Sequence, residues 1–518
     1  MRGPKVLLTE VISNFIPVRN GFYSPHTGLL SIAAYIEQSG FEVEVLDPWV
    51  SKMNWKQMLQ YIKNKSPDVV GLTSLTCHVY HTMALAKFIK QMCPHIVIIA
   101  GGHHFSMTPE ESLSVCDAID YIVIGEGEET FLELLKCIAA GGHRDEVTQI
   151  KGIAFKLGNQ FIRTPPRPCI EDLDILPYPA YHLLPSLKDV RIPLARGGTL
   201  GCTFSRGCDK KCNFCSESLL WRGKRRGVSV DRIIKQLELL VHRHKKYEFS
   251  INDTDFLYDR DRNIKFVDAL SSRRLPIKFR IATRVDSIIQ NRDILKEMRL
   301  LGLVAVAVGI ESFSQKVLDR WNKQINVGQI RVMADCIREA KIPVLEGLMM
   351  IGSYDDQRGT VRQIVKESSR AGVNILWCSI LTPFPKTPLY ERAIQNRAIK
   401  VWDYRRYDLY HAIMPTKYIS IKGLELLNII TYVLWFYNPV RFFKDLGEEY
   451  RRKFKLFQFC FDFRIFVNLI ITAINKLFGR RRNTYTTFIE MFFQKHLTSL
   501  NKNIQMPNTI KVWSPWYR

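Results

Sequence analysis

Three cysteines, Cys208, Cys212 and Cys215, stand close together near the middle of the chain, in the run SRGCDKKCNFC of residues 205–215. Cysteine thiolates hold iron–sulfur clusters, and a loop with this spacing can close all three around one 4Fe-4S cluster. Three thiolates leave one iron without a protein ligand. An open iron is wasteful in an electron carrier, but it lets a substrate bind the cluster directly. The spacing therefore indicates an enzyme with chemistry at the metal.

A zinc site or a disulfide framework would use cysteines differently. Zinc usually takes four ligands from paired Cys or His groups, and the next histidines, His242 and His244, lie well downstream on a predicted helix. Disulfide frameworks belong to small secreted chains, whereas the 12 cysteines here are scattered over 518 residues with no secretory signal. We expect the cysteines outside the loop to be mostly buried small hydrophobic residues. Cys202 is near enough to be considered as a fourth ligand, although it would close the open iron.

The composition limits the class of protein. A chain of 518 residues with 46% hydrophobic and 24% charged residues is long enough for two or three domains with proper cores, which excludes the disordered and fibrous classes. The formal charge is +24, and much of the basic excess lies in residues 401–518. Such charge attracts nucleic acid or an anionic membrane surface. Because no long apolar segment opens the chain, we expect a cytoplasmic protein.

The first predicted domain covers residues 1–142, where short apolar runs alternate with helical patterns. The predicted strands are Lys5–Thr9, Phe41–Asp47, Asp68–Ser74, Ile96–Ala100 and Tyr121–Ile124. The predicted helices lie near Gly28–Ser39, Trp55–Lys63, His81–Met92 and Thr130–Ala139. This alternation is typical of an α/β fold with a doubly wound, Rossmann-like parallel sheet. Such sheets bind ligands in the crevice beyond the carboxyl ends of their strands.

Three consecutive strand ends of this domain carry residues suited to a ligand. They are Ser74 and Thr76 after the third strand, Gly101, Gly102 and His103 after the fourth, and Gly125, Glu126 and Gly127 after the fifth. Glycines let a large flat ligand approach the backbone, and hydroxyl and amide groups can hold its polar edges. Each glycine pair alone could simply make a tight turn. The repetition at three strand ends favours a ligand.

The order of these motifs resembles the cobalamin-binding domain found ahead of radical S-adenosylmethionine (SAM) domains. The motifs are GLTSLT at 71–76, AGGHH at 100–104 and IGEGEETF at 124–131. The resemblance implies that cobalamin contacts the residues at these strand ends. The Asp-x-His-x-x-Gly signature that supplies an axial histidine in many other cobalamin domains is absent. The histidines His26, His78, His103 and His104 lack that context, and the lower cobalt face has no assigned histidine ligand.

A predicted linker covers residues 143–190. Lys151–Phe161 reads as a hairpin with Gly158 and Asn159 at its turn. Prolines then crowd the segment from Thr164 to Pro185, and because they interrupt both helix and strand, we place the interdomain connection there.

The second predicted domain covers residues 191–400 and resembles the radical SAM superfamily, with motifs in the expected order. The resemblance implies a partial (β/α)6 barrel whose active site lies at the carboxyl ends of its strands. The predicted strands are Phe249–Ile251, Phe279–Ala282, Val304–Val308, Val344–Met350 and Ile375–Leu381. The first three run into Asp253, Arg284 and Glu311.

The resemblance also implies roles in binding SAM. Asp253 stands where relatives place groups for the methionine amino group, and Glu311 where the family binds the ribose hydroxyls. Arg284 could pair bidentately with the SAM carboxylate, and Phe214 could contact the adenine. Taken singly, Arg284 and Glu311 could be an ordinary surface arginine and a helix N-terminal glutamate, and Phe214 could simply pack. Their order after the cysteine loop favours SAM contacts. Relatives usually carry glycine where Lys386 stands.

Together these features predict a cobalamin-dependent radical SAM enzyme. The resemblance implies that SAM binds the open iron and yields a 5′-deoxyadenosyl radical, while methylcobalamin faces the substrate. We therefore expect a C-methyltransferase acting on an unactivated carbon of a small-molecule, lipid or peptide substrate, with a reducing partner such as flavodoxin or ferredoxin. The alternative is a radical cyclase or rearrangement enzyme with the same cofactors. A methylthiotransferase or a non-catalytic cobalamin sensor fits the motifs less well.

The third predicted region covers residues 401–518 and is expected to be helical. The segment from Trp402 to His411 resembles the Tyr-Asp-x-x-His element of cobalamin-dependent cyclase and hopanoid-methylase relatives, so Tyr410 and His411 are candidate catalytic residues, with packing of the tail as the alternative. The apolar run Leu426–Tyr437 is shorter than the ~20 residues of a membrane span.

A longer segment, Phe454–Phe478, carries interspersed charges and basic clusters at both ends. It suits either an amphipathic helix at the surface of an anionic membrane or a basic helix docked on the barrel. No recognised RNA-binding module is present, and we expect no nucleic-acid partner.

Overall fold

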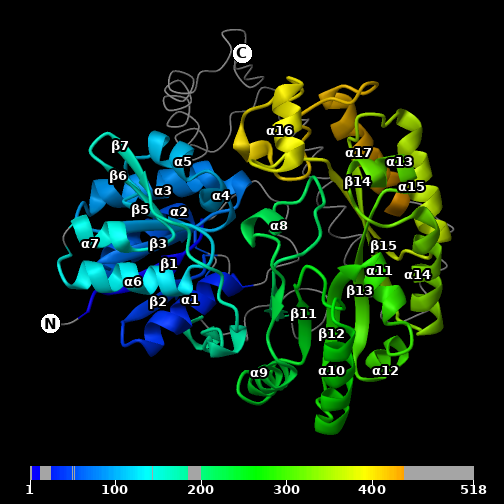
Figure 1. Cartoon of the computed structure of the whole chain (residues 1–518), viewed down its shortest axis with the longest axis horizontal. Helices are drawn as coiled ribbons and strands as arrows, with labels where there is room; N and C mark the ends of the chain where they lie inside the picture. The colour runs from blue at the N-terminus through cyan, green and yellow to red at the C-terminus, as the bar shows by residue number, and fades with distance from the viewer. Residues whose placement is uncertain are drawn as a thin grey trace.

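The structure is a computed structural model of the chain, and it describes residues 3–11, 25–48, 51, 53–142, 144–184 and 200–436. Two sheets lie next to each other, the N-terminal one in blue and cyan and the second one in green to yellow (Figure 1). Helix α8 (Glu217–Leu220) lies between them and contacts α4 (His103–Met107) of the N-terminal half.

The first sheet has seven strands among the described residues, in the order β2-β1-β3-β4-β5-β6-β7. Its strands are β1 Val6–Thr9, β2 Val43–Leu46, β3 Val69–Thr73, β4 Val97–Gly101, β5 Tyr121–Val123, β6 Ile153–Leu157 and β7 Gln160–Arg163. The first five pair in parallel, and the hairpin β6–β7 adds to β5 in antiparallel fashion. Strands β1 and β3 are buried throughout, as expected of a sheet covered on both faces.

Helices cover the two faces of this sheet. They are α1 Thr27–Gln38, α2 Trp55–Lys65, α3 Val79–Met92, α4, α5 Pro109–Val115, α6 Glu128–Ala139 and α7 Arg144–Gln149. Successive residues of a strand point to opposite faces, so Leu8 belongs to the core under α1 and α6, whereas Leu7 belongs to the core under α2 and α3. This arrangement confirms the doubly wound fold.

The second sheet has six described strands, all parallel, in the order β15-β14-β13-β12-β11-β8. They are β8 Leu200–Cys202, β11 Glu248–Ile251, β12 Lys278–Arg284, β13 Leu303–Glu311, β14 Val344–Ile351 and β15 Ile375–Ile380. Strands β15 and β8 are the two edges, so the described sheet is an open, curled half-barrel. The predicted partial (β/α)6 barrel is confirmed.

Further helices and one small sheet complete the described chain. The helices are α9 Val230–His242, α10 Arg260–Arg273, α11 Val285–Gln290, α12 Leu295–Leu300, α13 Gln315–Arg320, α14 Val327–Glu339, α15 Arg358–Arg370, α16 Pro388–Gln395 and α17 Ile421–Phe436. The short strands β9 (Ser205–Arg206) and β10 (Arg226–Gly227) pair in antiparallel fashion on either side of the cysteine loop. The loop is therefore closed at its base by a two-stranded ribbon.

Two helices were not predicted from the sequence. Helices α4 and α5 fill the connection between β4 and β5, where only the motif at 100–104 had been identified. They are short, and Pro109 begins the second of them, so periodicity gave little signal.

The predicted segment Phe454–Phe478 and its basic flanks lie outside the described residues. Within the described part of the chain, no helix is long and apolar enough to span a bilayer.

Candidate active site

The cysteine loop is held at the carboxyl end of the half-barrel by hydrogen bonds with the end of α13 and the two residues after it. The backbone N–H of Asn213 donates to the carbonyl of Trp321 over 2.9 Å, and its side-chain amide donates to the carbonyl of Arg320 over 2.8 Å. In return, the Asn322 side chain donates to the Lys211 carbonyl over 2.8 Å. The loop therefore has a fixed position although it has little regular structure.

The three cysteines fit a multi-iron cluster better than a single ion. Cys208 and Cys212 are buried, Cys215 is half-buried, and all three are free thiols. Within the described residues, no group of three or more His, Cys, Asp or Glu side chains could share one metal ion. In an iron–sulfur cluster each thiolate binds a different iron atom, so the three sulfurs do not need to converge on one point.

The charges around the loop also suit a cluster held by thiolates. Burial raises the pKa of the Cys215 thiol to about 12, and burial also raises the pKa of Cys212. Metal binding must deprotonate these thiols, and it then places negative charge in a buried site. Arg225 offers compensation, because its guanidinium lies 3.4 Å from the Cys208 sulfur and 3.1 Å from the Asp255 carboxylate.

The structure brings two of the predicted SAM contacts, Arg284 and Glu311, together around Lys323. The Lys323 ammonium lies 2.8 Å from the Glu311 carboxylate, and Arg284 donates to the Lys323 carbonyl over 2.8 Å. Arg284 also pairs with Asp286 over 2.9 Å. The positive charges of Lys323 and Arg284 act on the nearby Cys212, partly offsetting the effect of burial on its pKa. These strand ends therefore share one site with the cluster loop.

Glu311 has a strained backbone. It ends β13 with φ of 66°, in the left-handed region that residues other than glycine rarely occupy. Such a conformation costs of order 1–3 kcal/mol and persists where the surroundings impose it, often at functional sites. The strain supports a functional role for Glu311.

Glu311→Gln is expected to weaken SAM binding about tenfold. If Glu311 binds the ribose as predicted, removing its charge replaces charge-assisted hydrogen bonds, each contributing about 1.5–3 kcal/mol, by weaker neutral ones. Equilibrium dialysis against the anaerobically reconstituted protein measures the affinity, and the iron content reports whether the cluster loop is intact. Glu339→Gln, in the exposed pair with Arg292, is the matched control. Equal SAM affinities of the Glu311 variant and the wild type would exclude the proposed contact.

Phe214 and Asp253 have less direct relations to the site. Phe214 packs edge-on against Trp321, with ring centroids 5.7 Å apart and planes at 72°. Asp253 is buried, and one carboxylate oxygen accepts from the Phe204 backbone N–H over 2.7 Å, while the other has no hydrogen-bond partner among the described residues. Burial raises the pKa of Asp253. Asp253 therefore does not line the cavity between the two halves of the chain, whereas its neighbours Asn252 and Thr254 do.

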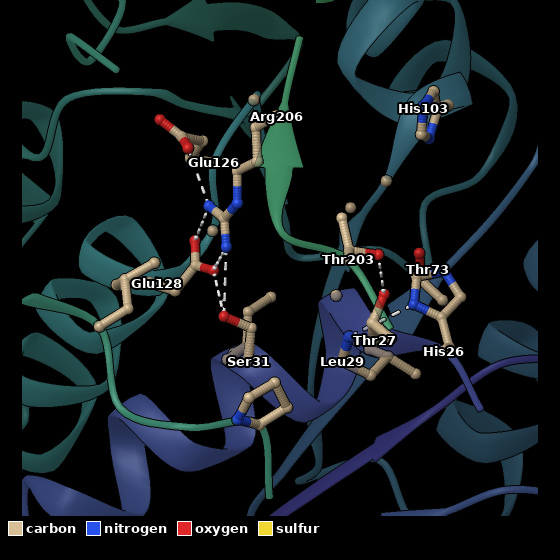
Figure 2. Close-up of a pocket in the computed structure, with 18 of the residues that line it drawn as sticks. His26, Thr27, Leu29, Ser31, Thr73, His103, Glu126, Glu128, Thr203 and Arg206 are labelled. Carbon is tan, nitrogen blue, oxygen red and sulfur yellow. Dashed lines mark hydrogen bonds and ion pairs between the residues drawn. The ribbon is translucent and has the colours of Figure 1, made fainter. Parts of the chain in front are cut away.

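A cavity of about 340 Å³ lies between the two halves of the chain. From the first sheet it is lined by the predicted cobalamin contacts Gly101, Gly102, His103, Gly125, Glu126 and Gly127. From the second half it is lined by Thr203, Ser205, Arg206, Gly207, Glu217 and Thr254. Figure 2 shows Thr203 and Arg206 together with His103, Glu126 and Glu128 of the first half. Ser74 and Thr76 do not line the cavity, because Ser74 accepts from Thr82 and Thr76 pairs with His104.

The wall formed by the first sheet suits a flat cofactor. Gly102 has φ of 88°, and a Cβ there would lie 2.5 Å from the Thr73 hydroxyl oxygen. Gly125 has φ of 83° and open space beside it. The turns that hold these glycines therefore cannot carry side chains without strain, which leaves the backbone accessible. Burial and the nearby His103 lower the pKa of His26 to about 4, so this imidazole is neutral at the cavity wall.

Glu126 lines the cavity and also takes part in an ionic network. Its carboxylate accepts from Arg206, from Arg226 and from the Ile170 backbone N–H, each over 2.8 Å. Arg206 and Arg226 were not predicted as site residues from the sequence, nor were Glu128 and Ser31, which also bind Arg206. Only the repeated Gly-Glu pattern at 125–128 could have drawn attention to an ionic network there.

Tyr410 and His411 lie at the carboxyl end of β15, where the Leu409 carbonyl accepts from the Ile380 backbone N–H over 2.7 Å. The buried Asp408 carboxylate contacts the His411 Nδ1 atom over 2.8 Å and accepts from both the Tyr410 and His411 backbone N–H groups. This contact fixes the orientation of the imidazole and the ring nitrogen that carries its proton. After the larger effect of burial, the negative charge of Asp408 also acts to raise the pKa of Cys77 and of His78 in the first domain.

Comparison with known proteins agrees with this geometry. Residues 18–135 match the B12 binding domain family, and residues 202–366 match the Radical SAM superfamily. An uncharacterised methyltransferase of Pyrococcus horikoshii is 30% identical over 83% of this chain and 92% of its own length. The chain belongs to the cobalamin-dependent radical SAM methyltransferase family.

A cyclase and a solved structure are also similar to this chain. The anaerobic magnesium-protoporphyrin IX monomethyl ester cyclase of Cereibacter sphaeroides is 26% identical over 83% of this chain and 70% of its own length. The cobalamin-dependent SAM radical enzyme OxsB, solved with aqua-cobalamin and SAM bound, has a TM-score of 0.68 and 15% identity over 97% of this chain and 80% of its own. The likeness to OxsB shows the shared fold.

The radical SAM enzyme therefore uses a 4Fe-4S cluster, SAM and cobalamin, and it requires a reductant and a small-molecule substrate. Cys208, Cys212 and Cys215 are the candidate cluster ligands, and the strand-end glycines are the candidate cobalamin contacts. When bound, the cluster and SAM supply a carbon-centred radical, and cobalamin supplies a transferable methyl group. The protein contributes position, charge and exclusion of water.

Proposed function

We propose that the enzyme methylates an unactivated carbon of its substrate. The observation that carries this proposal is the shared cavity. The same cavity is lined by Gly101 and Gly125 of the cobalamin-binding sheet and by Gly207, which directly precedes Cys208. A substrate placed there would have the radical source and the methyl donor on either side, as C-methylation requires.

The residues of the chain have distinct roles in this proposal. Arg284 and Glu311 hold the polar groups of SAM next to the cluster loop. His411, oriented by Asp408 over 2.8 Å, binds a polar group of the substrate or holds a proton at the end of β15. Tyr410 lies in the same turn, because Asp408 also accepts from its backbone N–H.

Labelled SAM tests the proposal directly. The protein is reconstituted anaerobically with iron, sulfide and hydroxocobalamin, then incubated with reductant, methyl-deuterated SAM and a bacterial lipid and metabolite extract. We expect S-adenosylhomocysteine and 5′-deoxyadenosine together with extract compounds that carry the labelled methyl group. A Cys208→Ala variant provides the background. Formation of 5′-deoxyadenosine without any transfer of label would contradict methylation and favour the alternative.

That alternative is a radical cyclase or rearrangement enzyme with the same cofactors. It is supported by the similarity to the Cereibacter sphaeroides cyclase and requires the same Cys208, Arg284 and Glu311 machinery. The two functions differ in the fate of the SAM methyl group, so the labelling experiment separates them.

We also infer peripheral contact with an anionic membrane. Helix α17 presents an exposed apolar stripe, with Leu426, Ile429, Val433 and Leu434 between 36% and 57% exposed. The chain is strongly basic at +24, which complements anionic lipid. Such contact would suit a lipid substrate. We expect flotation with phosphatidylglycerol vesicles and its loss in Leu426→Gln/Val433→Gln; protein that stays in the soluble fraction would refute the contact.

A further inference from the structure

Both ends of the cluster loop are tied to the cobalamin-binding sheet. Arg206 stands two residues before Cys208, and Glu217 stands two residues after Cys215. Each of these side chains contacts residues at the carboxyl edge of the first sheet, Arg206 through Glu126 and Glu217 through His103. The loop that carries the cluster ligands is therefore positioned in part by the other domain.

The first connection, the Arg206 bridge, is a buried ionic network. The Arg206 guanidinium lies 2.8 Å from Glu126, 2.5 Å from Glu128 and 3.2 Å from the Ser31 hydroxyl (Figure 2). The two carboxylate side chains are only 5% and 4% exposed. An arginine side chain is always charged in a folded protein, so this network holds one buried cation between two buried carboxylates. Charge-assisted contacts of this kind fix direction as well as distance.

The second connection, the Glu217 bridge, lies at the other end of the loop. Glu217 contacts the His103 Nε2 atom over 3.0 Å with one carboxylate oxygen and accepts from the Trp221 indole over 2.9 Å with the other. His103 begins α4, directly after the glycines at the end of β4. Trp221 follows α8, so the carboxylate is held between the two domains.

The partners of both bridges are cavity residues. Glu126 lies in the turn after β5, and Glu128 follows that turn as the first residue of α6. His103 follows the turn after β4 as the first residue of α4. These are the turns whose glycines the cobalamin is expected to contact. A ligand that orders or shifts these turns must therefore act on Arg206 and Glu217, and through them on the positions of Cys208 and Cys215.

We propose that Arg206 and Glu217 are positioning residues that couple cobalamin binding to SAM binding. Cobalamin in the cavity orders the turns after β4 and β5, the two bridges transmit this order to both ends of the cluster loop, and the loop then presents the open iron to SAM. Coupling of this kind is reciprocal, so SAM must strengthen cobalamin binding by the same factor. The proposal needs only that both cofactors bind, and it does not depend on which reaction follows.

The structure supplies variants that weaken the bridges without dismantling the interface. In Arg206→Lys the ammonium cannot bridge two carboxylates in the manner of the planar guanidinium. Glu126 would keep its contacts with Arg226 and Ile170. Glu217→Ala removes the second bridge independently. The matched control is Lys224→Met, two residues before β10, which breaks the exposed pair with Glu171.

The test measures SAM affinity by equilibrium dialysis in the full-length protein with a reconstituted cluster, with and without hydroxocobalamin. We expect cobalamin to tighten SAM binding at least ~5-fold in the wild type and in the Lys224→Met control. In Arg206→Lys and in Glu217→Ala we expect this ratio to fall toward one, while iron content and cobalamin binding at saturation are retained.

The ratio separates coupling from a merely structural role. If the bridges only hold the domains together, the substitutions weaken SAM binding equally with and without cobalamin, and the ratio does not change. An unchanged ratio in both variants, or a wild-type ratio of one, would overturn the proposal. If Arg206→Lys fails to load iron, Glu217→Ala decides the question. A failed methyl-transfer assay would leave this measurement unaffected, because no substrate is added.

Discussion

Alanine in place of Cys208, Cys212 or Cys215 is expected to abolish reductive cleavage of SAM. In the proposed site each thiolate holds one iron, and the cluster keeps its fourth iron open for SAM. Loss of a group that only supports a metal ligand commonly costs 10–100-fold, so loss of a ligand should cost more than ~100-fold. The measurement is 5′-deoxyadenosine formed anaerobically with dithionite, together with iron content per chain.

Cys202 is the matched control for these variants. It lies at the end of β8, close to the loop in sequence, but it is fully buried, and its sulfur accepts from the Tyr181 hydroxyl over 3.9 Å. Burial raises the pKa of Cys202 to about 12. We expect Cys202→Ala to retain iron and SAM cleavage. Retained cleavage in any of the three loop variants, or its loss in the Cys202 variant, would require a different set of ligands.

Much of the fold was predictable because the two sheets obey simple patterns. Parallel strands covered on both faces are short continuous apolar runs, and residues 6–8 and 303–308 are such runs. The cysteine loop was predictable because its three ligands are close in sequence. The position of the strand-end residues Arg284 and Glu311 near this loop followed from the rule that parallel strands end at one edge.

The interdomain contacts could not be predicted in the same way. Arg206 and Glu128 are separated by 78 residues, and the side chains that pair across such a distance are chosen by the docking of two domains. Single-sequence periodicity carries no information about that docking. Asp253 shows the same limit, since its strand end was assigned correctly while its carboxylate turns inward to the Phe204 backbone N–H.

Backbone conformation explains one departure from the family pattern. Relatives usually carry glycine where Lys386 stands, and the structure gives Lys386 a φ of 64°. The turn therefore keeps the left-handed conformation that favours glycine, and the side chain is exposed. The substitution changes the side chain at this turn, while the path of the backbone is maintained.

Glu346→Leu is expected to destabilise the half-barrel by about 3 kcal/mol. Glu346 lies on β14 and receives two hydrogen bonds from Arg280 of β12, over 2.6 and 2.8 Å, and one from the Trp377 indole over 2.9 Å. Its side chain is 2% exposed and that of Arg280 is 24% exposed. Removing the carboxylate leaves the guanidinium without its compensating charge. Because water partly reaches Arg280, the expected loss of folding free energy lies at the lower end of the about 3–5 kcal/mol typical of a broken buried ion pair.

The same pair predicts how stability depends on pH. Burial alone would raise the pKa of Glu346, but Arg280 and the hydrogen bonds to the carboxylate lower it overall. A carboxyl whose folded pKa lies below its unfolded value stabilises the protein fully above the unfolded pKa, near the ordinary 4.5, and loses this contribution as the pH falls through the lower folded value. Urea unfolding of wild type and Glu346→Leu should therefore differ most at neutral pH and converge in acid.

Glu339→Gln distinguishes a buried ion pair from an exposed one. Glu339 also pairs with an arginine, Arg292, over 2.7 Å, but both side chains are more than half exposed. Exposed pairs contribute about 0–1 kcal/mol, so this variant should unfold at nearly the same urea concentration as the wild type. If Glu346→Leu also unfolded at nearly the wild-type urea concentration at neutral pH, we would infer that water hydrates Arg280 inside the half-barrel. The pair across β12 and β14 would then contribute little to holding the half-barrel in shape.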